Sequence, residues 1–551
     1  KRYAACLAAE LRHDELIKDF LELYEKTDLG GKWLVKHGQG EEAVEEIYDK
    51  TDILAVLAGL ALAPELYAKF KRLAEWYLAG TCKSQALAYY LAPAIKSTTK
   101  SAELAKRIER GLFTLEDVLK AMALLYAGKW TKADEVKTGL ALLTGALRLS
   151  NATATLPHYA HLLDAAWANL SSDVADWLSA AVHQAALDSP DRVLQILAHS
   201  GETPEEAFKK LYQTATNAGK YLLLKTLLHI FATSPQTIAA LMGPESRPRE
   251  YLEKITSMTQ QFVRQLQDEV EKDYVIANIY PELILQQVQY GKNIKDLNID
   301  ITICLESIKN LTPQDISYLD RYIKLQQRSN IEELYETVHS AVHTLAVALT
   351  MHNLDNAISL AQTACELASK PLHIVRSCGL VGRLLSIRHG EPQLEIFEKI
   401  WRLISQAPEL TATPTAAAAL GHYLVALAYK GRLDDVKHLL HTHGHTLDID
   451  PTAASLTYGV LSIIDPHYLQ EALRYKPPKL ISSREILYAI LILLTGYIHG
   501  VVKTSDLEEV IKEAKKIDQL RNYFTELENS LKKKNWKKLL QIICKLYYIH
   551  I

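Results

Sequence analysis

The feature that most constrains the fold is a helical pattern on both sides of a short polar turn, within residues 339–371. Small or apolar residues recur at helical spacing before the turn, at Leu345 and Ala348, and after it, at Ala357, Ala361 and Ala364. Residues with this spacing share one face of a helix, and small side chains on that face let two helices approach closely. The stretch therefore predicts one antiparallel pair of helices.

Other stretches of the chain carry the same spacing around a glycine turn. Two copies turn at Gly128 and Gly431, and a weaker copy turns at Gly390, because Arg383 and Ser386 stand where apolar residues are expected. A supersecondary pattern that recurs along a chain is the signature of a repeat architecture, in which stacked units share one core. The alternative is that any amphipathic helix pair joined by a short turn shows this spacing.

The order of these residues, with Pro371 near the end of the unit, resembles a tetratricopeptide unit and the wider class of helical-pair repeats. The steps from His352 to Gly390 and Gly431 are about 40 residues, compared with roughly 34 in that family, and the resemblance covers about half of the chain. It implies an all-α fold: a right-handed superhelical α-solenoid of stacked antiparallel helix pairs.

In such a solenoid the first helix of each pair lines a concave groove, where proteins of this kind usually hold another chain. The partner-binding residues that the resemblance implies are Met122, Leu125, Val342, Ala346, Leu349 and Val425. Because they are mostly apolar, we expect a hydrophobic helical or extended protein segment as ligand rather than a charged carboxylate tail.

The expected function is therefore that of a non-enzymatic scaffold or adaptor. An alternative is the sensor or regulatory helical-repeat portion of a larger NTPase-type signalling protein, since the sequence starts at Lys1 without an initiator methionine.

Two clusters of helix-breaking residues divide the chain, at 243–249 and 476–479. They predict an N-terminal helical-repeat arm over 1–242, a central repeat arm over 250–475, and a C-terminal helical cap with a basic tail over 480–551. Helices are expected throughout, with no stretch long enough for a sheet before Asn151. Only Ile299 to Ile303 looks β-like.

Composition narrows the class of protein. With 48% hydrophobic and 23% charged residues the 551-residue chain is that of a folded protein, and its net charge of -3 gives no argument for a nucleic-acid or acidic partner. The six scattered cysteines suit a reducing compartment, where free thiols behave as small buried apolar groups. Because the apolar start is too short for a secretory signal, we expect a cytoplasmic protein.

Common catalytic motifs are absent from the sequence: there is no phosphate-binding loop, zinc-protease motif or nucleophile elbow. We therefore expect no enzymatic activity, no cofactor and no small-molecule substrate. The histidines between His438 and His445 are interpreted as the end of a helix capped by Gly444 rather than as a zinc site. Two E-x-x-H pairs, at 10–13 and 336–339, stand too far apart in a linear stack to form a di-iron site.

The run from Ile486 to Val502 contains 17 residues without a charged side chain. A helix of that length spans about 25 Å, less than the roughly 30 Å of a hydrocarbon core, so we expect a buried helix, with a membrane segment as the alternative.

The tail from Lys532 to Ile551 is basic and amphipathic. Its proposed contact residues are Lys532, Lys533, Lys534, Trp536, Lys537 and Lys538. Such a helix can contact nucleic acid, an anionic membrane or a protein. The favoured interpretation is a capping helix whose apolar side covers the last repeat while its lysines face water.

Overall fold

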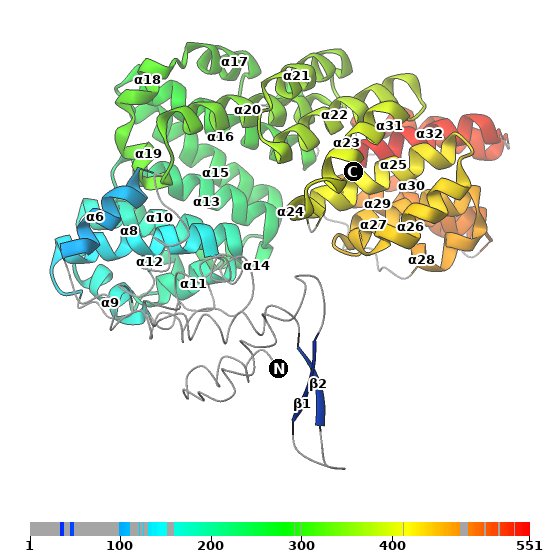
Figure 1. Ribbon diagram of the computed structural model, residues 1–551. Helices are drawn as coiled ribbons and strands as arrows, with labels where there is room; N and C mark the ends of the chain where they lie inside the picture. The colour runs from blue at the N-terminus through cyan, green and yellow to red at the C-terminus, as the bar shows by residue number, and fades with distance from the viewer. Residues whose placement is uncertain are drawn as a thin grey trace. The chain divides into compact units, whose positions relative to one another are not determined.

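In a computed structural model the described part of the chain is helical, apart from one β-hairpin (Figure 1). The structure describes residues 33–37, 44–48, 99–110, 121, 125, 130–150, 159–290, 292–297, 299–411, 413–473, 483–500, 503–515, 518–533 and 535–550. The coarse prediction of a helical protein is confirmed for these residues, whereas a superhelical arrangement of repeats remains a prediction.

The elements follow one another along the chain. They are β1 (Trp33–His37), β2 (Val44–Tyr48), α6 (Thr99–Glu109), α8 (Ala133–Ser150), α9 (Ala160–Ala168), α10 (Ser172–Asp188), α11 (Asp191–Ala198), α12 (Pro204–Thr214), α13 (Asn217–Thr233), α14 (Pro235–Met242), α15 (Pro248–Gln265), α16 (Glu269–Gln289), η3 (Ile294–Asp296), α17 (Ile301–Asn310), α18 (Pro313–Tyr318), α19 (Asp320–Gln326), α20 (Asn330–Leu349), α21 (Leu354–Leu367), α22 (Pro371–His389), α23 (Leu394–Ser405), α24 (Pro408–Thr411), α25 (Pro414–Tyr429), α26 (Leu433–Leu447), α27 (Pro451–Ile464), η4 (Pro466–Tyr468), α28 (Leu469–Leu473), α29 (Ser483–Ile498), α30 (Thr504–Ala514), α31 (Asp518–Lys532) and α32 (Trp536–His550).

Two local predictions about strands are wrong. β1 and β2 pair antiparallel, with Trp33 opposite Tyr48, in a region where only helices were expected. Both strands are rich in β-branched and aromatic residues, which favour pleated structure. Conversely, the β-like run at 299–303 lies at the start of α17, because Asp300 caps this helix by accepting a hydrogen bond from the Thr302 N–H.

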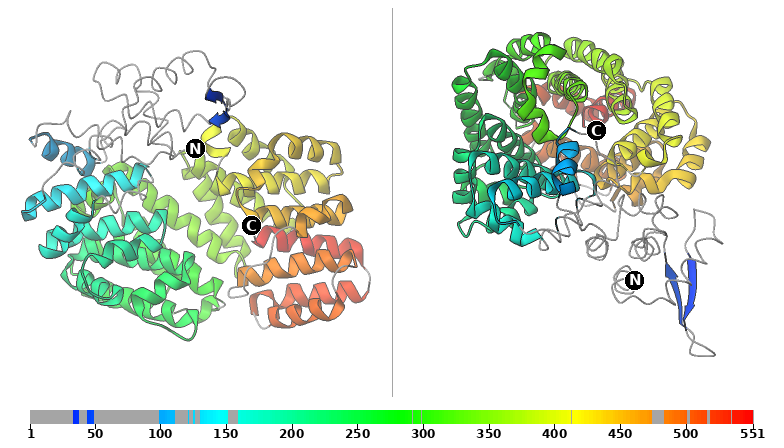
Figure 2. Two further views of the ribbon diagram at one scale, coloured as in Figure 1. Left: turned by 90° about the horizontal axis from the view of Figure 1, so that it is seen from below. Right: turned by 60° about the vertical axis from the view of Figure 1, so that its left-hand side comes forward.

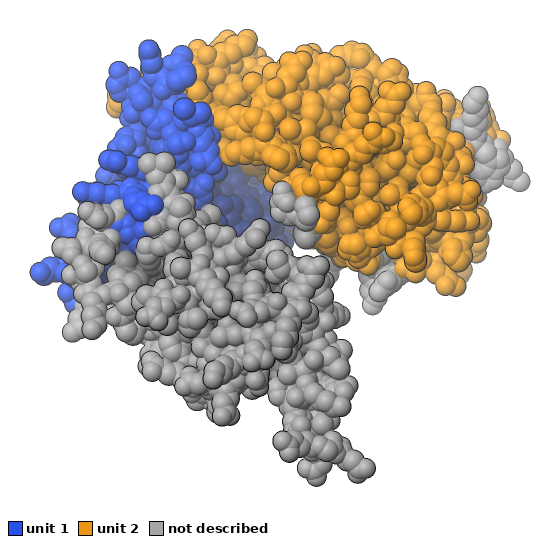
Figure 3. Space-filling model, viewed as in Figure 1, with its two compact units in different colours: residues 1–266, 312–333 blue, residues 267–311, 334–551 orange. Residues whose placement is uncertain are grey.

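The chain forms two compact units, coloured separately in Figure 3. Unit 1 comprises residues 1–266 and 312–333, and unit 2 comprises 267–311 and 334–551. These units do not follow the predicted boundaries, because residues 250–266 and 312–333 of the predicted central arm fall in unit 1 and residues 480–551 share unit 2 with the central helices.

The centre of unit 1 is α10, which packs against α8 on one side and α13 on another. Nearly every residue of α10 from Val174 to Ala186 is buried, and many of them are alanine. Small side chains on several faces of one helix allow several neighbours to approach it closely.

Capping side chains set the start of two helices in unit 1. The Ser171 hydroxyl accepts a hydrogen bond from the Val174 N–H at the start of α10, and Thr203 and Glu206 form a reciprocal capping box at the start of α12.

A buried carboxylate ties three segments of unit 1 together. Asp176 of α10 has no exposed surface and accepts hydrogen bonds from the Thr216 N–H (2.8 Å) and hydroxyl (2.6 Å). Arg321 of α19 binds the same carboxylate and also the more exposed Asp173. Gly219 packs against Asp176 so closely that a Cβ there would collide with it.

Short turns join consecutive helices at three of the predicted positions. They lie between α20 and α21 at 350–353, between α22 and α23 at 390–393, and between α25 and α26 at 430–432. The two helices pack on each other in the pairs α22–α23 and α25–α26. The predicted helices on both sides of these turns are present, and their identity as repeat units stays a prediction. The copy at Gly128 turns outside the described residues.

The last helix lies within the core of unit 2. α32 packs on α22, α27, α29 and α31, and Tyr547 and Tyr548 are fully buried. In Figure 2 the red C-terminal helices lie beside the orange helices of the same unit. Arg383 of α22 donates hydrogen bonds to the carbonyls of Tyr548 (3.1 Å) and Ile549 (3.4 Å). These carbonyls belong to the last turn of α32, where no further helical N–H is available. The C-terminal helix thus packs on helices as early in the chain as α22, and not only on those that precede it directly.

The apolar run from Ile486 lies mostly in α29, which packs against α27, α30 and α32. Ile490, Leu491 and Leu494 are buried there, as expected for a core helix. Among the described residues, no helix combines the length and apolarity needed to cross a membrane.

The contacts of Asp176 generate a stability prediction. Asp176→Ala should lower the free energy of local unfolding of α10 by about 2 kcal/mol, because the Thr216 N–H loses its acceptor in a largely buried site. Asp173→Ala, at the exposed end of the same Arg321 interaction, should cost less than about 1 kcal/mol. Hydrogen exchange of the α10 amides measures both, and equal losses would contradict the assignment.

Candidate functional site

The structure places the predicted groove residues in the interior. Leu125, Val342, Ala346, Leu349 and Val425 are each at most 6% exposed, so they make helix–helix contacts instead of lining an open surface. Met122 lies outside the described residues. Leu349 differs from the others in one respect, because it also lines a pocket.

This pocket lies in unit 2, between η3 and α17 on one side and the α20–α21 turn on the other, and has a volume of about 610 Å³. Its lining residues are Asn293, Ile294, Ile301, Thr302, Leu305, Leu349, His352, Asn353, Asn356, Ser359 and Leu360. Five of them are aliphatic, and none carries a carboxylate, an ammonium or a guanidinium group. The pocket therefore suits an uncharged group that is partly apolar.

Capping side chains fix the first residues of α17 and α21, the two helices that form opposite walls of the pocket. Asp300 starts α17, and the Asn353 side chain accepts a hydrogen bond from the Asn356 N–H (3.1 Å) at the start of α21. The turn at 350–353 then places the end of α20 beside the first two turns of α21. Sequence reasoning named Leu349 and the turn at His352 but missed the other lining residues. Those of η3 and α17 come from a stretch without repeat spacing, and those of α21 lie on another face than the alanines that define the pattern.

The titratable side chain in the pocket wall is His352. Burial lowers the pKa of its imidazole below the ordinary value, which favours the neutral ring near neutral pH. The pocket wall as described is thus uncharged under ordinary conditions.

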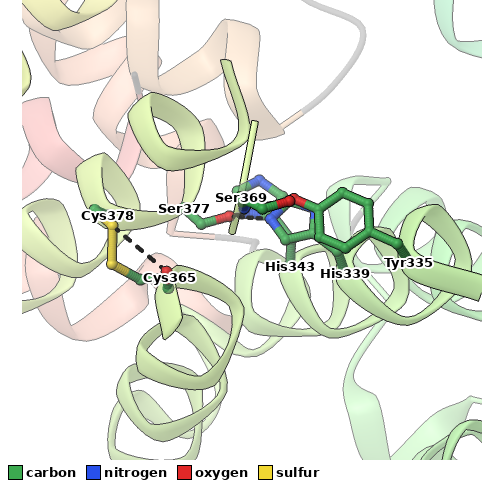
Figure 4. Close-up of a disulfide and its surroundings, with 7 residues drawn as sticks. All are labelled: Tyr335, His339, His343, Cys365, Ser369, Ser377 and Cys378. Carbon is green, nitrogen blue, oxygen red and sulfur yellow. Dashed lines mark hydrogen bonds between the residues drawn. A yellow bond between two sulfur atoms is a disulfide. The ribbon is translucent and has the colours of Figure 1, made fainter. Parts of the chain in front are cut away.

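A buried network of aromatic and polar side chains joins α20 to α22 nearby (Figure 4). The Ser377 hydroxyl lies 2.9 Å from His339 Nε2 and 3.1 Å from His343 Nδ1. A hydroxyl donates only one hydrogen, so at least one of these rings donates an N–H to the serine oxygen. Ser377 is fully buried, so its hydroxyl is not presented to a substrate.

A second part of this network centres on Tyr335. Its hydroxyl accepts a hydrogen bond from the Ser369 N–H (2.9 Å) and lies 3.0 Å from His373 Nδ1. Glu336 of α20, which belongs to one of the two E-x-x-H sequence pairs, forms an ion pair with Lys370 and lies near the His373 ring, both at the start of α22. The other pair, at 10–13, lies outside the described residues.

The environment of this network disfavours protonation of its histidines. Burial, reinforced by His373, lowers the pKa of His339 to about 4, against a smaller opposing effect of Glu336. Burial together with Arg376 lowers the pKa of His343 to about 3. Neutral imidazoles are therefore part of the folded structure.

Beside the network, Cys365 of α21 and Cys378 of α22 form a disulfide, with Cα atoms 4.8 Å apart (Figure 4). Cys304 and Cys544 are free and buried, as expected, whereas Cys6 and Cys82 lie outside the described residues. Stable disulfides are typical of oxidising compartments, so this pairing removes the support that cysteine usage gave to a cytoplasmic location.

The histidines between His438 and His445 lie along α26, which continues through Gly444 to Leu447. The glycine is therefore not the predicted cap. His443 packs edge-on against Trp401, at 5.2 Å between ring centres. In the described parts of the chain no group of three or more potential ligands is placed to bind a metal.

The basic tail is divided between two helices, because α31 ends at Lys532 and α32 begins at Trp536. Lys532 pairs with Glu528 (3.0 Å) and Lys538 with Glu526 (3.6 Å), while Lys533 is exposed. Lys534 and the side chains of Trp536 and Lys537 lie outside the described parts. Two of the predicted contact residues thus already have acidic neighbours within the fold.

Comparison of the chain with models of protein families, with curated proteins and with solved structures finds no match.

The histidine network generates a prediction about pH. Between pH 6.5 and the lowered pKa of His339 near 4, the unfolded state binds a proton that the folded state does not, so stability falls as the pH falls. His339→Gln should reduce the loss of stability between about pH 7.5 and about pH 5 by about 2 kcal/mol. Urea denaturation at both pH values measures this. His441→Gln makes the same substitution at an exposed position of α26 and is the matched control.

The disulfide generates a second prediction. Its cysteines are separated by 13 residues, and closing a loop of that size stabilises a fold by about 3 kcal/mol in the chain-entropy account. Cys365→Ser with Cys378→Ser, or reduction of the parent chain, should lower the stability of the α21–α22 pair by that amount. Hydrogen exchange of α21 amides before and after reduction provides the measurement. Unchanged protection would show that helix packing alone holds the pair.

Proposed function

We propose that this protein is a non-enzymatic scaffold or adaptor that binds a segment of a partner protein, anchored in the pocket of unit 2. The observation that carries the proposal is the lining of this pocket, where aliphatic and uncharged polar side chains meet at the α20–α21 turn. A helical fold alone is compatible with many functions, so the proposal depends on this site.

The chemistry of the pocket supports binding of an aliphatic side chain. Burial of apolar surface contributes about 25 cal/mol per Å², and Leu305, Leu349 and Leu360 offer such surface. The uncharged Asn and Ser side chains can hydrogen-bond to the amide groups that any peptide carries. A charged side chain would lose its hydration without meeting an opposite charge among the lining residues.

The size of the pocket also supports this proposal. A volume of about 610 Å³ falls in the range of roughly 300–1,000 Å³ that is typical of ligand sites in proteins. It exceeds what a single methyl or water site needs. Several side chains of one short segment therefore fit together.

Selection of peptides from a displayed library on the immobilised full chain tests this function. Selected peptides should be rich in uncharged aliphatic residues, and Asn356→Trp should weaken their binding at least tenfold, because Asn356 is exposed at the pocket wall and an indole would occupy the pocket. Gln362→Trp is the matched control, since it places the same indole on another exposed face of α21. Equal binding by both variants would refute the site.

A further inference from the structure

One side of α21 continues from the pocket towards the end of the helix without a charged side chain. This uncharged stripe consists of Asn356, Leu360, Thr363 and Leu367, at positions i, i+4, i+7 and i+11. Residues at these offsets lie on one side of a helix. The charged residues of α21, Asp355 and Glu366, lie outside the uncharged stripe.

The uncharged stripe is accessible at its far end. Asn356 and Thr363 are exposed, Leu360 is half-buried in the pocket wall, and Leu367 is 40% exposed. A single exposed leucine is ordinary on a protein surface. Leu367 differs because it lies on the same side of α21 as Leu360, which lines the partly apolar pocket.

Packing holds the uncharged stripe in a fixed orientation. On another side of α21, Ala357, Ala361 and Ala364 are buried against α22, and the disulfide from Cys365 fixes the end of the helix to Cys378. α21 therefore cannot rotate to bury Leu367. With a rise of about 1.5 Å per residue, Leu360 and Leu367 stand about 10.5 Å apart along the helix axis.

This spacing distinguishes between the two kinds of segment that the sequence left open. In an extended strand, residues on the same face are about 6.6 Å or about 13 Å apart, because side chains alternate at about 3.3 Å per residue. In a helix, residues seven apart lie on the same face and about 10.5 Å apart. A partner helix that lies nearly parallel to α21 therefore matches both leucines.

We propose that the partner segment is an amphipathic helix that lies along α21, with two aliphatic side chains one heptad apart, one in the pocket and one on Leu367. The proposal rests on the proposed function and identifies the class of partner. Glu366 stands exposed beside the uncharged stripe, so the flank of the partner helix that faces it carries lysine or arginine.

Synthetic peptides test the geometry directly. A helical peptide with two leucines seven residues apart and lysines on one flank is the probe, and its Kd for the full chain is measured by fluorescence anisotropy. A second peptide of identical composition has its leucines five residues apart, which places them on different sides of the helix. The heptad-spaced peptide should bind about tenfold more tightly. Equal affinities, or no binding of the heptad-spaced peptide at millimolar concentration, would overturn the proposal.

Variants of the chain separate this inference from the proposed function. Leu367→Glu should raise the Kd of the heptad-spaced peptide about tenfold, whereas Leu540→Glu, at an exposed leucine of α32, should leave it unchanged. If Asn356→Trp blocks the library-selected peptides while Leu367→Glu changes nothing, the pocket function stands and the helical partner is refuted. If neither variant affects any peptide, both proposals fail.

Discussion

Close contact between neighbouring helices is the constraint on which the rest of this structure depends. At several helix crossings the residue at the contact is a glycine, and any larger side chain there would collide with the neighbouring helix. A Cβ on Gly382 of α22 would lie 2.8 Å from the Phe397 ring of α23, and a Cβ on Gly421 of α25 would collide with Thr457 of α27. Alanines fill the same role where α21 meets α22. Dispersion forces and apolar burial reach full strength only at such distances, so small residues at crossings stabilise both units.

The same small residues made much of the local fold predictable. Alanine at positions 357, 361 and 364, a cap at Asn353 and a break before Pro371 together specify the α20–α21 pair, and α21 begins and ends within this frame. Local signals of this kind act over a few residues, so one sequence suffices to read them. The candidate pocket was harder to predict, since α17 and α21 come from separate stretches of the chain and, of the lining residues, sequence reasoning had named only Leu349 and His352.

Several features that sequence reasoning missed depend on a contact that the repeat spacing does not encode. Arg383 weakens the repeat pattern at Gly390, yet the arginine is needed where it stands, because it binds carbonyls of α32. Ser386 likewise stands at an expected apolar position and accepts a hydrogen bond from the Gln393 N–H at the turn. From the sequence, Cys365 and Cys378 were interpreted as free thiols. In the structure the turn between α21 and α22 places them close enough to form a disulfide. Repeat spacing disfavours Arg383 and Ser386 and says nothing about the cysteines, whereas the three-dimensional contacts explain all four residues.

The position of α32 has a consequence for how the protein is made. In a simple stack of repeats each helix pair can fold on its predecessor as soon as it leaves the ribosome. Here α22 emerges long before the helix that covers it, since the contact from Arg383 to Tyr548 spans 165 residues. Until then the surfaces that receive Tyr547 and Tyr548 stay open to water and to other nascent chains. The core of unit 2 is therefore complete only after α32 has been synthesised.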